Sequence, residues 1–546
     1  MRKWFPAGLI TGALLVACGS QRLGASGPQT APVSQAVTGS PSQIGQWAFV
    51  PGYSTSVDTN WPLIAINTAV MPDGNVITWG GNEQTAYYST RKGKYQPVDV
   101  WDPVANTHKS YPFPMLTTGS AISIFCSGMT FDADGRLMVV GGDRPPDGGV
   151  TMGMGSNTLN IFDAKSRQWR SGAPMANGRW YPSATTLATG EILAVAGEND
   201  MGFGNPNRIP EVYRADGTWH QLTGINRETP GYPWLFVVPD PEGKDPNGRV
   251  FFAGPTTTLG YIDTSGATGG SWQDLRERDE ILRQYGTAVM YNQGKILVMG
   301  GGGVDIGSPE YPTNTAVVID LAKLNAGAPD AVRATEPMHY ARRQLNATLL
   351  PDGKVLVTGG TQAQGASEAN GCLSNGVCGD LQVYAAEVWD PSTEHWTELA
   401  SMTKPRLYHS TAVLLPDGRV LSAGGGAGAN TADQQNAEIF SPPYLFQTTV
   451  KRPVIAKVPA QVRYGQRFTL NTSDAASIDQ VTWIRLSSTT HAFNMNQRIN
   501  FLPFTRGSGS LSITAPARAV DAPPGHYMLF ILSRGVPSVA RIVQVK

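Results

Sequence analysis

Three side chains that could bind a metal or carry a redox reaction occupy one shared position in a repeated segment. Cys126, Tyr181 and His409 each lie nine residues before the glycine of a turn, and Tyr408 directly precedes His409. Thiol, phenol and imidazole groups are soft or borderline metal ligands. Equivalent positions in a closed array of repeats converge on one axis, so residues far apart in the chain can meet there. The shared position therefore predicts a metal or redox site.

Two more repeats hold a functional side chain at this position, namely Tyr285 and Gln344. The first repeat has Ala65 there, and the fourth repeat is too distorted for the count. Taken singly, a tyrosine or a cysteine is explained by packing, and a histidine by a satisfied polar contact. Packing does not require the same position to hold Cys, Tyr and His, so the common position favours a site at the mouth of the axis.

The elements that must position these residues are short strands. Each repeat has an apolar strand, a turn centred on Asp-Gly or a substitute, a second apolar strand and a Gly-Gly pair. The copies recur about every 50 to 60 residues, a period that resembles kelch repeats. A single sheet of this kind cannot bury both of its faces, so the pattern predicts a seven-bladed kelch-type β-propeller. The seven copies span residues 67–81, 127–142, 182–197, 235–254, 286–301, 346–360 and 410–425.

A different pattern follows the last repeat. Segments such as 466–472 and 526–533 alternate like the strands of a small β-sandwich. We therefore predict an all-β chain with a propeller over residues 46–446 and an immunoglobulin-like sandwich, of the early set type, over residues 447–546. Residues 47–50 are expected to close the ring by pairing with the last blade.

Composition and charge restrict the function. The chain has 546 residues, with 62 Gly and 40 Pro, as expected for many short strands joined by tight turns. Its formal net charge is zero, so neither a nucleic-acid partner nor an acidic tail is indicated. The sequence is expected to belong to a monomer that acts on small molecules.

The N-terminus resembles a bacterial lipoprotein signal. Residues 1–18 begin with basic residues, continue with an apolar stretch too short to span a bilayer, and end at Cys18. We expect a lipidated Cys18 at the start of the mature chain, or alternatively an ordinary signal peptide cut nearby. Either implies export to the cell envelope or beyond it, with membrane contact only through the lipid. Residues 19–45 are then expected to form a flexible linker.

The other cysteines divide into a pair and a single thiol. Cys372 and Cys378 lie six residues apart in a loop, and in an oxidising compartment they are expected to form a disulfide. Cys126 is left over. A single thiol in an exported protein requires an explanation, such as burial, an intermolecular partner or a reaction.

Five motifs resemble, in order, those of the copper radical oxidases, meaning galactose oxidase and glyoxal oxidase. The resemblance covers nearly everything from about residue 46 to the C-terminus. It implies a copper ion bound by Tyr181, Tyr408, His409 and His491, with a thioether between the Cys126 sulfur and the ring of Tyr181 as the carrier of a tyrosyl radical. His491 would reach the propeller axis from the sandwich domain. The motifs are FCSGMTFDADGRLMVVGGD (125–143), RWYPSATTL (179–187), RLYHSTAVLLPDGRVLSAGGG (406–426), THAFNMNQRI (490–499) and GHYMLFILSRGVPSVARI (525–542).

The resemblance also implies a reaction. Tyr408 would accept the O–H proton of an alcohol or hydrated aldehyde, the Tyr181 radical would take hydrogen from the adjacent carbon, and O2 would be reduced to hydrogen peroxide. The first expectation is a small aldehyde such as glyoxal or methylglyoxal, oxidised to the acid. The alternatives are a primary alcohol oxidase similar to galactose oxidase and a non-catalytic kelch binding protein.

One departure from galactose oxidase concerns the tryptophan that covers the thioether. Galactose oxidase stacks a tryptophan over the thioether, whereas the corresponding stretch here, residues 196–202, has none. Trp180 is the candidate replacement, and the triplet Arg179-Trp180-Tyr181 is similar to the glyoxal oxidase branch. Trp180, Tyr285 and Gln344 are expected to line the substrate mouth, although plain packing would also explain Tyr285 and Gln344.

Overall fold

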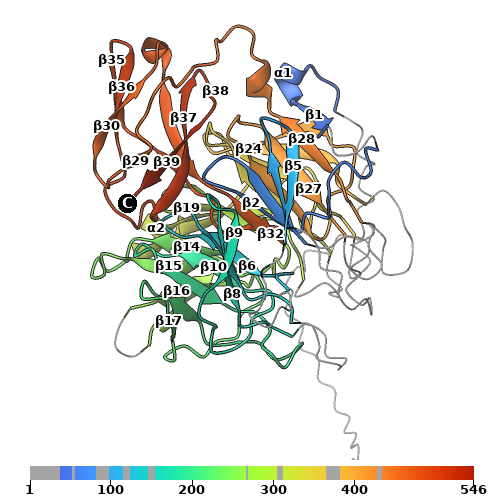
Figure 1. Ribbon diagram of the computed structural model, residues 1–546, viewed down its shortest axis with the longest axis vertical. Helices are drawn as coiled ribbons and strands as arrows, with labels where there is room; N and C mark the ends of the chain where they lie inside the picture. The colour runs from blue at the N-terminus through green and yellow to red at the C-terminus, as the bar shows by residue number, and fades with distance from the viewer. Residues whose placement is uncertain are drawn as a thin grey trace, which may run out of the picture. The chain divides into compact units, whose positions relative to one another are not determined.

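The computed structural model describes most of the chain after residue 36, and residues 36–546 form one compact unit (Figure 1). Cys18, Cys372 and Cys378 lie outside the described residues, so the lipidation and the disulfide stay predictions. The described residues are 37–51, 56–80, 98–112, 114, 123–144, 154–265, 269–303, 311–363, 381–426 and 433–546.

Seven four-stranded antiparallel units form the propeller, as the repeats predict. Blade one has β2 (Asn67–Val70), β3 (Val76–Trp79), β4 (Val98–Asp102) and β5 (Thr107–Tyr111); blade two has β6 (Gly128–Phe131), β7 (Leu137–Val140), β8 (Leu159–Asp163) and β9 (Gln168–Ser171). Blade three has β10 (Ser183–Thr186), β11 (Ile192–Val195), β12 (Glu211–Tyr213) and β13 (Trp219–Gln221); blade four has β14 (Leu235–Val238), β15 (Arg249–Phe252), β16 (Thr258–Asp263) and β17 (Ser271–Glu277).

The remaining blades follow the same order. Blade five has β18 (Thr287–Asn292), β19 (Lys295–Met299), β20 (Ala316–Asp320) and β21 (Val332–Thr335), with the short helices α2 (Leu321–Asn325) and η2 (Pro329–Ala331) between its last two strands. Blade six has β22 (Asn346–Leu349), β23 (Val355–Thr358), β24 (Ala385–Asp390) and β25 (His395–Ser401). Blade seven has β26 (Ser410–Leu414), β27 (Val420–Gly424), β28 (Ala437–Ser441) and, from the start of the chain, β1 (Gln46–Phe49).

The burial of the strands explains their composition. The two inner strands of blade one, β2 and β3, are buried throughout, whereas its outer strand β5 is largely accessible. Neighbouring blades cover both faces of the inner strands, which therefore consist mainly of apolar residues. The turn glycines Gly135 and Gly190 have φ angles of 83° and 85°, a conformation that favours glycine.

The ring is closed by the strand expected from the sequence. β1 pairs with β28, and Trp47 lies opposite Phe440. The ordered chain begins earlier than predicted, because α1 (Pro41–Ile44) lies inside the segment expected to be flexible. Ser40 and Gln43 form a capping box at its start, and Gln447 donates a hydrogen bond to the Ser42 carbonyl at 3.1 Å.

The C-terminal domain is a β-sandwich of two sheets around a core that includes Phe468, Trp483 and Tyr527. Its elements are η4 (Pro443–Phe446), which leads into it, β29 (Gln461–Val462), β30 (Arg467–Asn471), η5 (Ala475–Ser477), β31 (Gln480–Arg485), β34 (Ile499–Phe501), β35 (Phe504–Gly507), β36 (Ser510–Thr514), β37 (Gly525–Ser533), β38 (Val536–Pro537) and β39 (Arg541–Val545).

One hairpin of this domain joins the propeller. β32 (Ser488–Thr490) and β33 (Phe493–Asn494) extend the sheet of blade one, and β32 lies beside β2 (Figure 1). Thr490 pairs with Asn67, at the start of β2. The residue after Thr490 is thereby delivered to the axial end of blade one.

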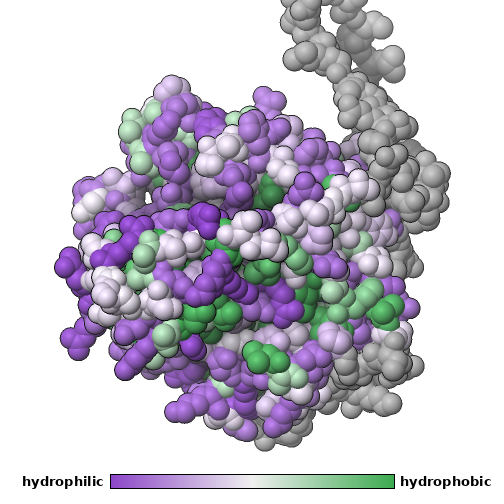
Figure 2. All heavy atoms as spheres, turned by 90° about the horizontal axis from the view of Figure 1, so that it is seen from above, coloured by the Kyte–Doolittle hydropathy of each residue, from purple (hydrophilic) through white to green (hydrophobic). Residues whose placement is uncertain are grey.

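Few of the described residues expose a large apolar side chain. On the face in Figure 2, hydrophobic residues lie in small separate patches among polar ones. Among the described residues, no helix has the length and hydrophobicity needed to cross a bilayer.

Candidate metal centre

The residues that lead into the innermost strands of blades two to seven share an unusual backbone conformation. Six non-glycine residues there have positive φ: Cys126 (55°), Tyr181 (70°), Tyr232 (51°), Tyr285 (55°), Gln344 (60°) and His409 (67°). A left-handed conformation costs a non-glycine residue roughly 1–2 kcal/mol. Such strain is concentrated at functional sites. Its recurrence at the same position in six blades indicates that these residues belong to one site.

In blade one, the residue at the equivalent position on the axis comes from the sandwich domain. Its own residue, Ala65, has no ligand atom, but His491 follows β32 directly and also has positive φ, at 46°. Since Thr490 pairs with Asn67 of β2, His491 stands where blade one would contribute a side chain. A loop of the sandwich domain thus completes the arrangement on the axis.

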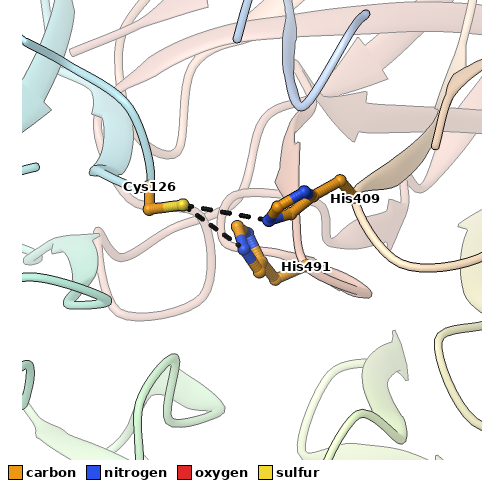
Figure 3. A group of neighbouring side chains, drawn as sticks. All are labelled: Cys126, His409 and His491. Atoms are coloured by element: carbon orange, nitrogen blue, oxygen red, sulfur yellow. Dashed lines mark hydrogen bonds between the residues drawn. The ribbon is translucent and has the colours of Figure 1, made fainter. Parts of the chain in front are cut away.

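Three potential ligands from this ring converge in the structure (Figure 3). Cys126 Sγ lies 3.6 Å from His491 Nε2 and 3.9 Å from His409 Nε2. All three ligand atoms lie within 4.8 Å of one another, and the three residues are buried. Segments separated by more than 280 residues therefore meet at one buried point.

Hydrogen bonds fix both imidazoles with Nε2 facing this point. His409 Nδ1 donates to the Gly426 carbonyl at 2.6 Å, because a carbonyl oxygen only accepts. The Thr490 hydroxyl donates to the Ile66 carbonyl, so its oxygen accepts from His491 Nδ1 at 2.7 Å. Both rings therefore carry their proton on Nδ1 and present the Nε2 lone pair, as metal-binding histidines with an oriented second nitrogen do.

Burial keeps the two imidazoles neutral. It lowers the pKa of His409 to about 3, with the Gly426 carbonyl acting in the opposite direction. Burial, followed by repulsion from His409, lowers the pKa of His491 well below its ordinary value. At neutral pH both lone pairs are available for a metal.

Two phenols complete the cluster. The hydroxyl groups of Tyr181 and Tyr408 are hydrogen-bonded to each other, and the Tyr408 ring stacks on His409 with centroids 3.7 Å apart. Burial raises the pKa of both phenols well above the ordinary value, so both are protonated unless a cation is close. Two imidazole nitrogens and two phenol oxygens form a donor set that fits copper(II).

Cys126 has the properties of a neutral thiol. Burial, and next the charge of Asp143, raise the pKa of its sulfur well above the usual value. Because thiolates rather than thiols bind metals, these surroundings disfavour Cys126 as a ligand. Its thiol also interacts with the Tyr181 side chain.

Trp180, the candidate replacement for the missing tryptophan, stacks on Tyr181. Its ring lies on that of Tyr181 with centroids 3.9 Å apart and planes 22° apart. The adjacent residue in the chain thus covers the phenol of Tyr181. Phe203 in turn contacts Trp180 edge-on, with centroids 4.7 Å apart.

Tyr285 and Gln344 lie in the same ring and are both buried. The Tyr285 ring meets Tyr408 edge-on with centroids 5.8 Å apart, and the Gln344 backbone N–H donates to the Tyr285 carbonyl at 2.7 Å. Tyr285 is thus a neighbour of Tyr408, and Gln344 is a neighbour of Tyr285. Their role toward a substrate stays a prediction.

Tyr232 is the site residue that the sequence analysis missed. Its ring stacks on His491, with centroids 4.5 Å apart, and lies 4.9 Å from that of Tyr181. Because the turn of blade four contains an insertion, counting nine residues back from its glycine does not lead to Tyr232. A local signal existed, because Tyr232-Pro233 repeats the Tyr181-Pro182 pair.

The fold and the site define a class: a two-domain β-propeller protein with a buried centre of histidines, tyrosines and one thiol. The family model "Glyoxal oxidase N-terminus" matches residues 287–444, and "Galactose oxidase-like, Early set domain" matches residues 452–545. The chain is 29% identical to a galactose oxidase from Gibberella zeae, over 89% of this chain and 69% of that protein.

Other oxidases are similar to this chain over most of its length. The aldehyde oxidase GLOX of Vitis pseudoreticulata is 29% identical, over 81% of this chain and 84% of that protein. A fungal alcohol oxidase of the AA5 family, solved in complex with copper, has a TM-score of 0.74 and 27% identity, over 92% of this chain and all of that one. In sequence and fold the chain is similar to the copper radical oxidases of the galactose oxidase and glyoxal oxidase family, and it is an oxidoreductase.

Proposed function

We propose that this protein oxidises an aldehyde or primary alcohol with O2, producing hydrogen peroxide. The observation that carries the proposal is the meeting of two oriented imidazoles, two hydrogen-bonded phenols and one neutral thiol at a single buried point. A protein that only binds a partner would not need Cys126 beside Tyr181.

Copper would be held by Tyr181, Tyr408, His409 and His491. When bound, the ion supplies a site for the substrate oxygen and accepts one electron. Tyr181, once oxidised to a phenoxyl radical, would be the second one-electron acceptor, so that the two together match a two-electron oxidation.

Each step then has a residue. Tyr408 accepts the O–H proton of the alcohol or of the hydrated aldehyde. The hydrogen bond between the Tyr408 and Tyr181 hydroxyl groups holds Tyr408 at the centre. Tyr181, as a phenoxyl radical, takes the hydrogen atom from the adjacent carbon. The alcohol gives an aldehyde, or the hydrate an acid, and O2 receives the two electrons and two protons as peroxide.

Cys126 makes Tyr181 easier to oxidise. A bond from its sulfur to the ring removes one hydrogen from the thiol and one from the ring, with O2 as the oxidant. A thioether substituent donates electron density to the phenol. Trp180 covers the face of the modified ring and excludes water from it.

The substrate is proposed to be a small aldehyde of the glyoxal type, because the triplet Arg179-Trp180-Tyr181 is similar to the glyoxal oxidase branch. A primary alcohol is the second candidate, because the chain is equally similar to galactose oxidase and resembles a structurally defined alcohol oxidase. A peroxide-coupled panel of copper-loaded protein with glyoxal, methylglyoxal, galactose and glycerol distinguishes them. We expect the highest kcat/KM with an aldehyde; a clear preference for galactose would reject that choice.

The hydrogen bond between Thr490 and His491 Nδ1 gives a separate prediction. Thr490→Val removes the acceptor for His491 Nδ1, so the ring loses its orientation. We expect copper(II) affinity to fall roughly 10- to 100-fold, measured by competition with a chelator. Thr489→Val is the matched control, because the Thr489 hydroxyl donates to the Ala412 carbonyl and not to a ligand. Equal affinity in both variants would contradict the role of Thr490.

The N-terminal residues support export of this oxidase. Lipidation of Cys18 stays a proposal, and the mass of the N-terminal peptide from envelope-extracted protein tests it. A mature N-terminus at another residue, without lipid, would leave export through an ordinary signal peptide.

A further inference from the structure

A cleft lined by residues of blades five and six lies at the end of the strands that is remote from the candidate centre. Its volume is about 370 Å³. Tyr291 and Asn292, which line it, are the last two residues of β18, whereas Tyr285, a neighbour of Tyr408, lies two residues before β18 begins. The six residues of β18 span about 20 Å, so a small ligand in the cleft does not reach the centre. Phe501, at the end of β34, brings the sandwich domain to the same cleft.

The Tyr291 hydroxyl has no hydrogen-bond partner among the described residues, although Tyr291 is only 6% exposed. Its ring is held edge-on against Trp389, with centroids 4.9 Å apart. The charges that act on the hydroxyl are those of Glu394, Arg333 and Asp320, which all line the cleft. The hydroxyl end of Tyr291 therefore faces the cleft, and a buried polar group without a partner in the protein marks a position for ligand contact.

This hydroxyl can act both as a donor and as an acceptor. Burial, and next the charge of Glu394, raise the pKa of Tyr291 to about 12. The phenol is therefore protonated at neutral pH, with an O–H to donate and lone pairs to accept.

The charged side chains of the cleft are equal in number and paired. An ion that enters the cleft has to displace one of these partners, whereas a neutral molecule does not. Each pair still offers N–H donors and carboxylate acceptors, and hydrogen bonds to charged groups are stronger than those between neutral ones. The pairs are Arg333 with Glu394, held by two hydrogen bonds, Lys323 with Asp330, and Lys295 with Asp320 at 3.7 Å.

Phe501 adds an aromatic surface to the cleft. Its side chain is 41% exposed. Its ring also lies against the turn of blade six, where a Cβ added to Gly353 would stand 2.8 Å from Phe501 Cζ. This contact holds the ring in place while part of it remains accessible. The face of an aromatic ring carries partial negative charge and attracts the C–H groups of a ligand.

We propose that this cleft, here called the charge-balanced cleft, binds one or two rings of a neutral saccharide. The hydroxyl groups of a sugar donate and accept, which matches the Tyr291 hydroxyl and the paired charges. The C–H face of a sugar ring matches Phe501. A cleft of several hundred Å³ is of the size that holds a small ligand. The site is independent of the oxidase reaction, and it would hold the protein on a carbohydrate while the centre, at the other end of β18, acts on its substrate.

The first test measures saccharide binding by the full chain. Cellobiose, maltose and chitobiose are titrated into copper-loaded protein by isothermal titration calorimetry under nitrogen, so that no turnover occurs. Inorganic phosphate and glucuronate are the ionic probes. We expect at least one of the three disaccharides to bind more tightly than either ionic probe. Binding of none of them, or tighter binding of an ionic probe, would overturn the proposal.

Two variants locate the bound sugar. Tyr291→Phe keeps the ring and its contact with Trp389 and removes only the hydroxyl, so the affinity should fall roughly 3- to 10-fold. Phe501→Ser removes the aromatic surface and should lower the affinity roughly 10-fold. Tyr213→Phe on blade three and Val539→Ser, at a 52% exposed side chain of the sandwich domain, are the matched controls and should bind like wild type.

A third variant distinguishes the cleft from the centre. Tyr181→Phe alters the centre and leaves the cleft intact, so it should keep the wild-type affinity for the disaccharide. Thermal unfolding checks the fold of Tyr291→Phe, and we expect the wild-type Tm because its hydroxyl makes no hydrogen bond to the described residues. Unchanged affinity in both Tyr291→Phe and Phe501→Ser would refute the charge-balanced cleft, whatever the result for Tyr181→Phe.

Discussion

Replacing Tyr181 with phenylalanine is expected to abolish peroxide formation. The phenol oxygen of Tyr181 is hydrogen-bonded to that of Tyr408, and its ring lies between Trp180 and Tyr232. The variant keeps the ring and its packing but removes the atom that would carry the radical and bind copper. We expect kcat/KM to fall by roughly 1000-fold or more, which corresponds to about 4 kcal/mol of lost transition-state stabilisation.

Two readouts distinguish this outcome from misfolding. His409, His491 and Tyr408 remain, so Tyr181→Phe should still bind copper(II), with lower affinity. The optical and EPR signals of an oxidised, radical-coupled centre should be absent from it. Tyr213→Phe, on β12 of the same blade and away from the centre, is the matched control and should match wild type. Substantial turnover by Tyr181→Phe would show that another residue carries the radical.

Replacing Cys126 with serine is the second large effect expected. In wild type, copper(II) and air should join the Cys126 and Tyr181 peptides, with a mass two hydrogens below their sum. Burial and the Asp143 charge disfavour the thiolate form of Cys126 that would bind the metal directly, and the thiol interacts with Tyr181. Serine has no such chemistry, so the joined peptide should be missing.

The variant should retain copper but oxidise substrate slowly. Without the sulfur substituent the Tyr181 phenol is harder to oxidise, and we expect a loss of roughly 100-fold in kcat, or about 2.7 kcal/mol. Wild-type protein kept free of copper is the control for peptide mass and should show two separate peptides. A free Cys126 in wild type after copper and air would remove the thioether from the mechanism.

The repeats allowed much of the fold to be predicted, because their signals are local. Each Asp-Gly turn demands positive φ, and each apolar strand demands cover on both faces, so seven copies indicate seven blades. The count from the turn glycines also placed Cys126, Tyr181 and His409 at equivalent positions. It failed in blade four, where residues between Val238 and Arg249 form a long turn whose N–H groups are bound by the Asp240 carboxylate.

The sequence by itself determined which residues hold equivalent positions before the inner strands of blades two, three, five, six and seven, since that follows from local spacing. Only the tertiary structure decided what those residues do together. The pairing of β32 with β2 places His491 on the axis, and the carbonyls of Gly426 and Ile66 set which imidazole nitrogen faces the centre. Trp180 covers Tyr181, and Tyr232 joins the cluster, through contacts between rings. Such contacts depend on how blades and domains pack against each other, and no spacing along the chain encodes them.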